Sequence, residues 1–130
     1  MPLLNSPDPI RKLIWTLYIQ KPLNELLDRI LPQKEVSGIY KITNTKNKKS
    51  YIGRSVNVRN RLQEHVKSSL GIGTIANQKI HEAMREEGVW NFTFELLEQV
   101  EKDQLSSREK YYIKFFETDG ICGYNQTAGG

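Results

Sequence analysis

The feature that most restricts the fold of this chain is a strand–turn–strand pattern over residues 37–53. Its two arms, residues 37–43 and 50–53, have the composition of β-strands, and the polar stretch between them contains two asparagines, which favour turns. The pattern predicts a β-hairpin. Alternation along the first arm places Gly38, Tyr40 and Ile42 on one face and Ile39 and Lys41 on the other.

Two amphipathic helices are expected after the hairpin. The first has Ser55 as its cap, ends near the glycines of residues 71–73, and should bury Val58, Leu62 and Val66. The second covers about residues 76–88. Its buried row consists of Ala76, Ile80, Ala83 and Met84.

A strand and a helix complete the pattern. Alternating apolar residues indicate a third strand at the centre of the sheet: Trp90, Phe92, Phe94 and Leu96. Another apolar stripe marks a third helix: Leu105, Tyr112, Ile113 and Phe116. Residues 120–130 read as a glycine-punctuated coil. Together these elements predict an α+β fold in which helices flank a small three-stranded antiparallel sheet.

The first 35 residues should form a separate pair of short helices. An apolar row runs behind the Asp8 cap: Ile10, Leu13, Ile14 and Leu17. Pro22 can open a second helix and Pro32 ends it, with an apolar stripe of Leu23, Leu26, Leu27, Ile30 and Leu31. The boundary falls at residues 33–36, which divides the chain into an extension, 1–35, and a main domain, 36–130. The two stripes should dock on that domain, or on a second copy to form a homodimer.

The basic residues are unevenly distributed. Between residues 41 and 67 there are eight basic residues against one acid, and from 95 to 119 there are seven acids against four bases. This asymmetry indicates a basic surface that faces a polyanion, although a solvated, lysine-rich hairpin would give the same pattern. The single cysteine, Cys122, excludes an internal disulfide or a zinc site of several thiolates, and it fits a soluble protein in the reducing interior of a cell. No apolar run is long enough to predict a membrane span.

One carboxylate lies where an apolar residue is expected. Glu109 falls on the apolar stripe of the third helix, and burial of an unpaired charge costs several kcal/mol. Its partner should therefore be a basic side chain, with Arg61 as the obvious candidate, or a divalent cation.

The strings Gly38-Ile39-Tyr40 and Tyr51-Ile52-Gly53, on the two arms of the hairpin, resemble the paired signature of the GIY-YIG nuclease family. Further matches follow in order: Arg61, His65, Glu109 and the string Gly123-Tyr124-Asn125. The similarity covers about residues 36–130 and looks closest to the intron-encoded homing endonuclease branch. It implies a metal-dependent endonuclease that hydrolyses DNA, and it leaves the target sequence open.

The resemblance also implies roles for the matched residues. Glu109 would hold one Mg²⁺ or Mn²⁺ ion, with water and phosphate oxygens as the other ligands. Tyr40 would receive the proton of the attacking water, which requires nearby cations to lower its pKa, and Tyr51 would hydrogen-bond the water or the phosphate. Outside such a family, both tyrosines would be read as half-buried strand aromatics.

The remaining matches concern the phosphate. Arg61 would stabilise the transition-state charge, because a guanidinium offers two donors and keeps its charge. His65 would transfer a proton or hold Tyr40, unless it is a satisfied histidine on the helix surface. His81 is expected on the polar side of its helix, at the surface. Asn125 would brace the active site, or it is a turn residue after Gly123.

Six residues are candidates for contact with nucleic acid: Arg54, Ser55, Lys46, Lys48, Lys49 and Arg59. The lysines could equally be solvated loop charges. Some homing members carry a second histidine before the second helix, whereas residues 73–77 (GTIAN) here contain no titratable side chain. Two alternatives to a nuclease remain: an inactive nucleic-acid-binding module of the same fold, or an assembly component that acts through its leading helices.

Overall fold

The computed structural model describes residues 8–75, 78–121 and 123–126. Predictions for Ala76, Asn77 and Cys122 fall outside these ranges. The described elements run in this order: α1 (Asp8–Ile14), the π-helix η2 (Trp15–Ile19), α2 (Gln20–Ile30), β1 (Gly38–Asn44), β2 (Ser50–Ser55), α3 (Val58–Ser69), α4 (Lys79–Glu87), η3 (Val89–Asn91), β3 (Phe92–Gln99), η4 (Lys102–Gln104) and α5 (Leu105–Phe116).

The sheet is antiparallel, and its strand order is β2-β1-β3. The α+β class and the three antiparallel strands are therefore confirmed. The predicted place of the third strand is wrong: β1 is central and β3 lies at an edge. The third strand also begins at Phe92, because Trp90 belongs to the one-turn helix η3 and is exposed. Alternation along a strand reports which face is buried, but not which neighbour pairs with it.

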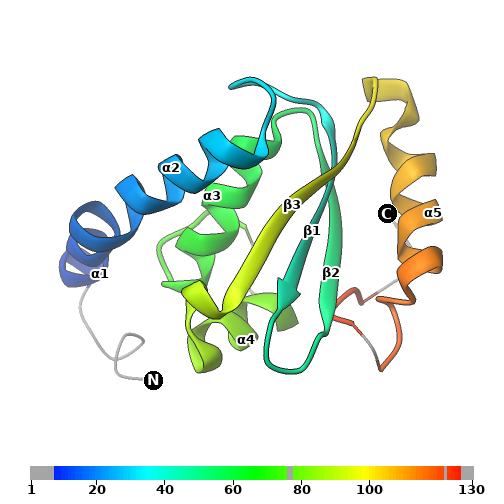
Figure 1. Cartoon of the computed structure of the whole chain (residues 1–130). Coiled ribbons are helices and arrows are strands. Elements are labelled where there is room, and N and C mark those ends of the chain that lie inside the picture. Colours follow the sequence, from blue (N-terminus) through cyan, green and yellow to red (C-terminus); the bar gives the residue numbers. More distant parts are fainter. Residues whose placement is uncertain (1–7, 76–77, 122, 127–130) are drawn as a thin grey trace.

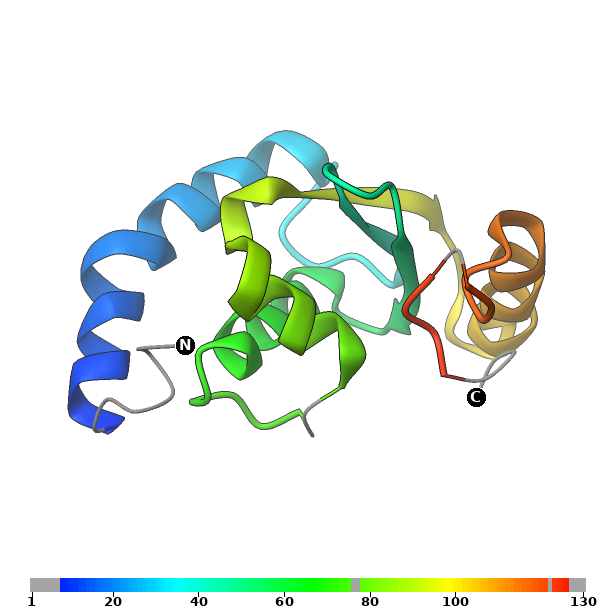
Figure 2. The ribbon, with the colours of Figure 1, turned by 90° about the horizontal axis from the view of Figure 1, so that it is seen from below.

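Helices cover both faces of the sheet (Figure 1). Tyr40, Ile42 and Phe94 belong to a core shared with α2, α3 and α4, whereas Ile39 and Ile52 pack with α5 on the other face. The view from below shows the sheet nearly edge-on between these two layers (Figure 2). Lys41, whose Nζ lies 3.9 Å from the centroid of the Phe116 ring, is on the α5 side, as alternation predicted.

The hairpin turn and the start of α3 are held by asparagines. Asn44 Oδ1 accepts from Lys46 N at 2.9 Å, and Asn47 Oδ1 accepts from Lys49 N at 2.9 Å. At α3 the cap is Asn57, whose side chain accepts from Asn60 N at 3.1 Å. Ser55, the predicted cap, bonds to the backbone of Asn57 just before the helix instead.

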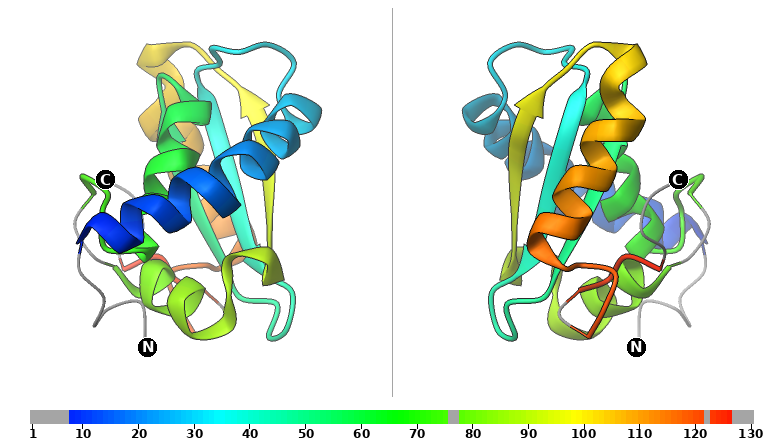
Figure 3. Two further views of the ribbon diagram at one scale, coloured as in Figure 1. Left: turned by 90° about the vertical axis from the view of Figure 1, so that its left-hand side faces the viewer. Right: turned by 90° about the vertical axis from the view of Figure 1, so that its right-hand side faces the viewer.

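The leading segment is one continuous helical rod, not two helices (Figure 3). Pro22 lies inside α2 and has no N–H for the carbonyl of Tyr18, four residues earlier. The π-helical turn η2 includes that carbonyl, which accounts for the local change in helix geometry. Within the described residues, no helix is long and apolar enough to cross a membrane.

The buried stripe of the rod is only partly as predicted. Leu23, Leu27 and Leu31 are buried against the main core, but most of the expected row of the first helix is turned to solvent. Ile10, Leu13 and Leu17 are exposed, and Trp15 and Ile19 are buried in their place. Ile14 is the one member of the expected row that packs, partly buried, against the core.

Candidate active site

Tyr40 occupies the central strand and faces α3. Its side chain is 1% exposed and lies opposite Gly53 on β2. A Cβ atom at position 53 would stand 2.2 Å from the ring and the hydroxyl of Tyr40. Glycine is therefore required at position 53 because the tyrosine ring packs directly on the backbone there.

Tyr51 lies on the same face of the sheet, opposite Ile42. It is half-buried, and its ring centroid is 6.4 Å from that of Tyr40 and 5.3 Å from that of His65. The rings of the two hairpin tyrosines thus lie close together beside His65, and Tyr51 is the more exposed of the two.

Helix α3 contributes Arg61 and His65, one turn apart. His65 is fully buried rather than at the helix surface, and its Nε2 lies 2.7 Å from the Tyr40 hydroxyl oxygen. Arg61 is half-buried, and its charge acts on Tyr40, Tyr51 and His65.

His81 was expected at the surface, and this prediction is wrong. It is fully buried on the side of α4 that packs against α3, with Nε2 2.8 Å from Nδ1 of His65. The neighbouring Ile80 and Met84 were read as the buried row of α4, and His81 extends that row by one position. Helical periodicity alone does not decide on which side of a short stripe a polar residue lies.

Glu109 approaches the site from α5, on the opposite side of the sheet. It is 8% exposed, and its Oε1 lies 3.5 Å from Nη1 of Arg54 on β2. Because β2 is an edge strand, side chains from both faces can meet around it. The carboxylate is close enough to Tyr40 and Tyr51 for its charge to raise the pKa of both.

The tyrosines are harder to ionise here than free tyrosine. Burial raises the pKa of Tyr40 well above its usual value, as do the charges of Tyr51 and Glu109, and Arg61 offsets only part of this. Burial and then Glu109 raise the pKa of Tyr51 as well. The sequence-based expectation that nearby cations lower the pKa of Tyr40 is therefore wrong for the protein without a bound cation.

Asn125 braces the outer edge of β2. Its Oδ1 accepts from Ile52 N and its Nδ2 donates to Ile52 O, both at 2.8 Å. These two bonds satisfy the backbone of the residue between Tyr51 and Gly53 at the open edge of the sheet. The contact observed for Asn125 is with the strand that carries Tyr51.

The residues considered for nucleic-acid contact have different surroundings. Arg59 forms an ion pair with Asp28 of α2 at 2.6 Å, and Lys46 with Glu87 of α4 at 3.1 Å. Lys48 is exposed in the hairpin turn. Contact with nucleic acid stays a prediction for all six residues.

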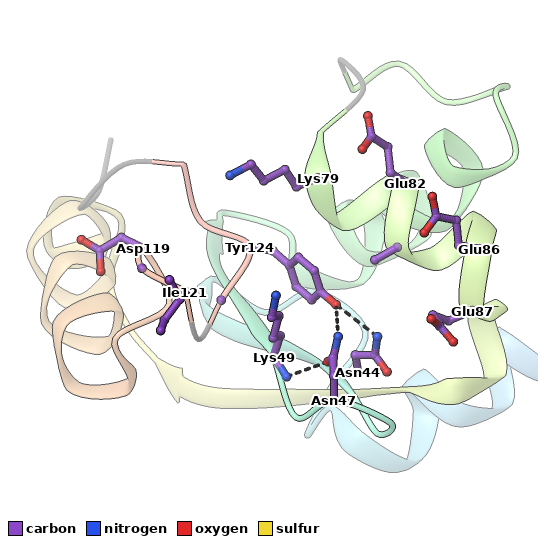
Figure 4. Close-up of a pocket in the computed structure, with 13 residues that line it drawn as sticks. Asn44, Asn47, Lys49, Lys79, Glu82, Glu86, Glu87, Asp119, Ile121 and Tyr124 are labelled. Atoms are coloured by element: carbon purple, nitrogen blue, oxygen red, sulfur yellow. Dashed lines mark hydrogen bonds between the residues drawn. The ribbon is translucent and has the colours of Figure 1, made fainter.

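A hollow of about 560 Å³ lies between the hairpin turn, α4 and the segment after α5 (Figure 4). Two lysines, Lys49 and Lys79, line it, but none of the residues predicted to be catalytic does. Four carboxylates line it: Glu82, Glu86, Glu87 and Asp119. This concentration of negative charge is unfavourable for a phosphate, so we place the candidate site at the tyrosines.

A cation at this site would depend on Glu109. Among the described residues, no group of three or more His, Cys, Asp or Glu side chains could enclose a metal ion. With Glu109 as the single carboxylate, a hard cation such as Mg²⁺ would take its other ligands from water and phosphate oxygens.

Comparisons with known proteins agree with this geometry. The sequence model of the GIY-YIG catalytic domain family matches residues 36–125. A mutant of the catalytic domain of the intron endonuclease I-TevI is 31% identical, with a TM-score of 0.63 over 73% of this chain and 97% of that one. The catalytic domain of the homing endonuclease I-TevI is 32% identical, with a TM-score of 0.59 over 70% and 98%. No curated protein matches significantly.

Proposed function

Because this chain belongs to the GIY-YIG catalytic-domain family, we propose that it is an endonuclease that hydrolyses DNA phosphodiester bonds with the help of one divalent cation. The observation that carries the proposal is the meeting of Tyr40, Tyr51, Arg61 and His65 on one side of β2 with Glu109 on the other. The similar solved structures are catalytic domains of an endonuclease. We further propose that residues 36–130 form the catalytic domain and residues 1–35 a helical extension.

In this mechanism Tyr40 accepts the proton of the attacking water. The free phenol is protonated, since burial raises its pKa, so it must first give its own proton to solvent water. Arg61 favours that loss and also offers donors to the phosphate oxygens. Tyr51, the more exposed phenol, hydrogen-bonds the water or the phosphate.

Glu109 holds the cation in this proposal. Mg²⁺ or Mn²⁺ would neutralise charge on the phosphate oxygens and on the leaving group. Arg54, 3.5 Å from Glu109, balances the carboxylate in the free protein and would contact the phosphate when DNA binds. Lys48 on the hairpin turn would contact the backbone further away.

A plasmid assay tests the activity. Supercoiled DNA is incubated with the full chain and Mg²⁺ or Mn²⁺, with EDTA, with Glu109→Ala, and with Glu86→Ala, which removes an exposed carboxylate of α4. We expect relaxed or linear DNA with the wild type and Glu86→Ala only. If the wild type leaves the plasmid supercoiled with either metal, the enzyme proposal fails and an inactive DNA-binding module becomes the better account. Equal cutting by the wild type and Glu109→Ala would mean that Glu109 does not hold the cation.

A further inference from the structure

The two histidines of this chain stand in series behind Tyr40. Nε2 of His65 lies 2.7 Å from the hydroxyl oxygen of Tyr40. Nδ1 of the same ring lies 2.8 Å from Nε2 of His81. Both side chains are completely buried, and their ring centroids are 5.1 Å apart. His81 lies outside the residues that the family motif identified, and nothing in the proposed mechanism uses it so far.

A backbone amide fixes the direction of these hydrogen bonds. Gln78 N–H donates to Nδ1 of His81 at 3.1 Å, and an amide nitrogen can only donate. A neutral His81 therefore carries its proton on Nε2 and donates it to Nδ1 of His65. His65 must then carry its own proton on Nε2 and donate to the oxygen of Tyr40.

Both rings are neutral near pH 7. Burial, followed by the charges of Arg85 and Arg61, lowers the pKa of His81 to about 4. Burial, His81 and Arg61 together lower the pKa of His65 well below its usual value. The order of donors and acceptors above, which applies to neutral rings, therefore holds under physiological conditions.

We propose that His81 is a positioning residue for the reaction: it holds His65 in the Nε2–H tautomer, so that His65 can only donate to Tyr40. This inference rests on the proposed nuclease function. The donated hydrogen bond favours the phenolate over the phenol, because a charged oxygen accepts more strongly. It also leaves the hydroxyl proton of Tyr40 free to point away from His65.

Loss of His81 would allow the opposite direction. With its proton on Nδ1, His65 would present a bare Nε2 to Tyr40, and the tyrosine would have to donate its hydroxyl proton to that nitrogen. The phenolate would then face a lone pair instead of a donor. Tyr40 would be a poorer proton acceptor even if every backbone position were unchanged.

Nitrogen NMR of the full chain reads the tautomers directly. Because the sequence contains two histidines, a ¹⁵N-histidine sample gives signals from only these two rings. At pH 7 without metal we expect both rings to be neutral and protonated at Nε2. A proton on Nδ1 of His65 in the wild type would overturn the proposal.

Two substitutions test the link to the reaction. His81→Gln keeps an N–H group that can donate to His65, whereas His81→Leu fills the space without a donor. We expect His81→Leu to change the tautomer of His65 and to lower kcat roughly 10-fold or more with little change in KM. His81→Gln should retain the tautomer and most of the rate. Equal kcat for wild type and His81→Leu, or equal loss for both variants, contradicts the proposal.

A control separates positioning from stability. Ile80→Val trims a buried residue of the same helix without touching the histidines. It should lower the melting temperature, but it should leave the spectrum and kcat unchanged. If Ile80→Val lowers kcat as His81→Leu does, the effect is one of packing and the proposal fails. Should the wild type cut no DNA, the proposed function fails, whereas the spectra of the wild type and His81→Leu still decide whether His81 sets the tautomer.

Discussion

The ring of Tyr40 packs directly against the backbone of Gly53, so the addition of a single methyl group at position 53 should disturb both stability and activity. In Gly53→Ala the new Cβ would lie 2.2 Å from the Tyr40 ring unless the ring moves. Movement would break the 2.7 Å contact between Tyr40 and His65. We expect a loss of about 1–3 kcal/mol in the free energy of unfolding, measured by urea denaturation, and loss of plasmid cutting.

Gly120→Ala is the matched control. The nearest atom to a Cβ at position 120 is 3.8 Å away, an ordinary contact. Its unfolding free energy should stay close to that of the wild type. If Gly53→Ala is equally stable and equally active, the close packing of Tyr40 on β2 is not needed for either property.

The buried histidines make stability depend on pH. In the unfolded chain a histidine binds a proton near pH 6.5, whereas in the folded protein His81 does so near pH 4 and His65 also well below its usual value. Their contribution to stability is therefore complete above pH 6.5 and is lost as the pH falls towards 4. For His81 this loss is on the order of 3 kcal/mol.

Urea denaturation at a series of pH values measures this loss. Carboxylates titrate in the same range, so the comparison is with His81→Gln, which has the same carboxylates and one histidine fewer. The wild type should lose more stability between pH 6.5 and 4 than the variant. Parallel curves would mean that His81 is protonated as readily in the folded protein as in the unfolded chain.

At the level of elements, the segment after α5 secures β2. Tyr124 N donates to Ser50 O at 2.8 Å, and Asn125 makes its two bonds with Ile52. These contacts hold the strand that presents Tyr51 and Gly53. We therefore expect Asn125 to act on the site through the edge of the sheet.

Asn125→Ala should expose the N–H and C=O of Ile52 and weaken this edge. We expect a loss of about 1–3 kcal/mol in unfolding free energy and a lower cutting rate. Gln126→Ala, which shortens the exposed amide next along the chain, should change neither quantity. Hydrogen exchange of the Ile52 amide provides a local readout, and unchanged protection in Asn125→Ala would contradict the role given to this residue.

Sequence periodicity correctly predicts which face of a single strand or helix is buried, because that pattern lies within one short segment. The alternation in β1 and the stripes of α2, α3 and α5 were correct, because each reflects one face turned to the core. Strand order was wrong, since pairing between β1 and β3 joins residues that lie 48 (Asn44 and Phe92) to 61 (Gly38 and Gln99) positions apart and leaves no local pattern. The misplaced carboxylate of Glu109 was visible in the sequence, but its neighbour Arg54 belongs to another element.

His81 was missed for a related reason. Its burial depends on how α4 packs against α3, and its partner is 16 residues away. Once a helix–helix pairing is known, a polar residue beside a buried row becomes a candidate for the interface. The tyrosine–histidine contact could be anticipated from the family motif, whereas the second histidine required the structure.

For the whole molecule, the two ends of the leading helical rod differ in how they pack against the main domain. Leu23 and Leu27 are completely buried in the same core as Tyr40 and Ile42. The N-terminal part of the rod is different, because Leu13, Leu17 and Tyr18 are exposed. We infer that α2, together with Trp15 and Ile19 of η2, is part of the folding unit, and that the exposed side of α1 and η2 is the surface of the rod through which two copies could associate.

This view predicts different results along one rod. Leu23→Ala should lower the unfolding free energy by about 2–5 kcal/mol, because it opens a cavity in the shared core. Leu17→Ala, at a site that is 65% exposed, should change it by less than about 0.5 kcal/mol. Urea denaturation followed by tryptophan fluorescence should give a single transition for both, since Trp15 is buried in the rod and Trp90 lies beside β3. Two separate transitions would mean that the rod folds independently. Light scattering of the full chain tests association, and a monomeric mass would rule out a dimer formed through the helices.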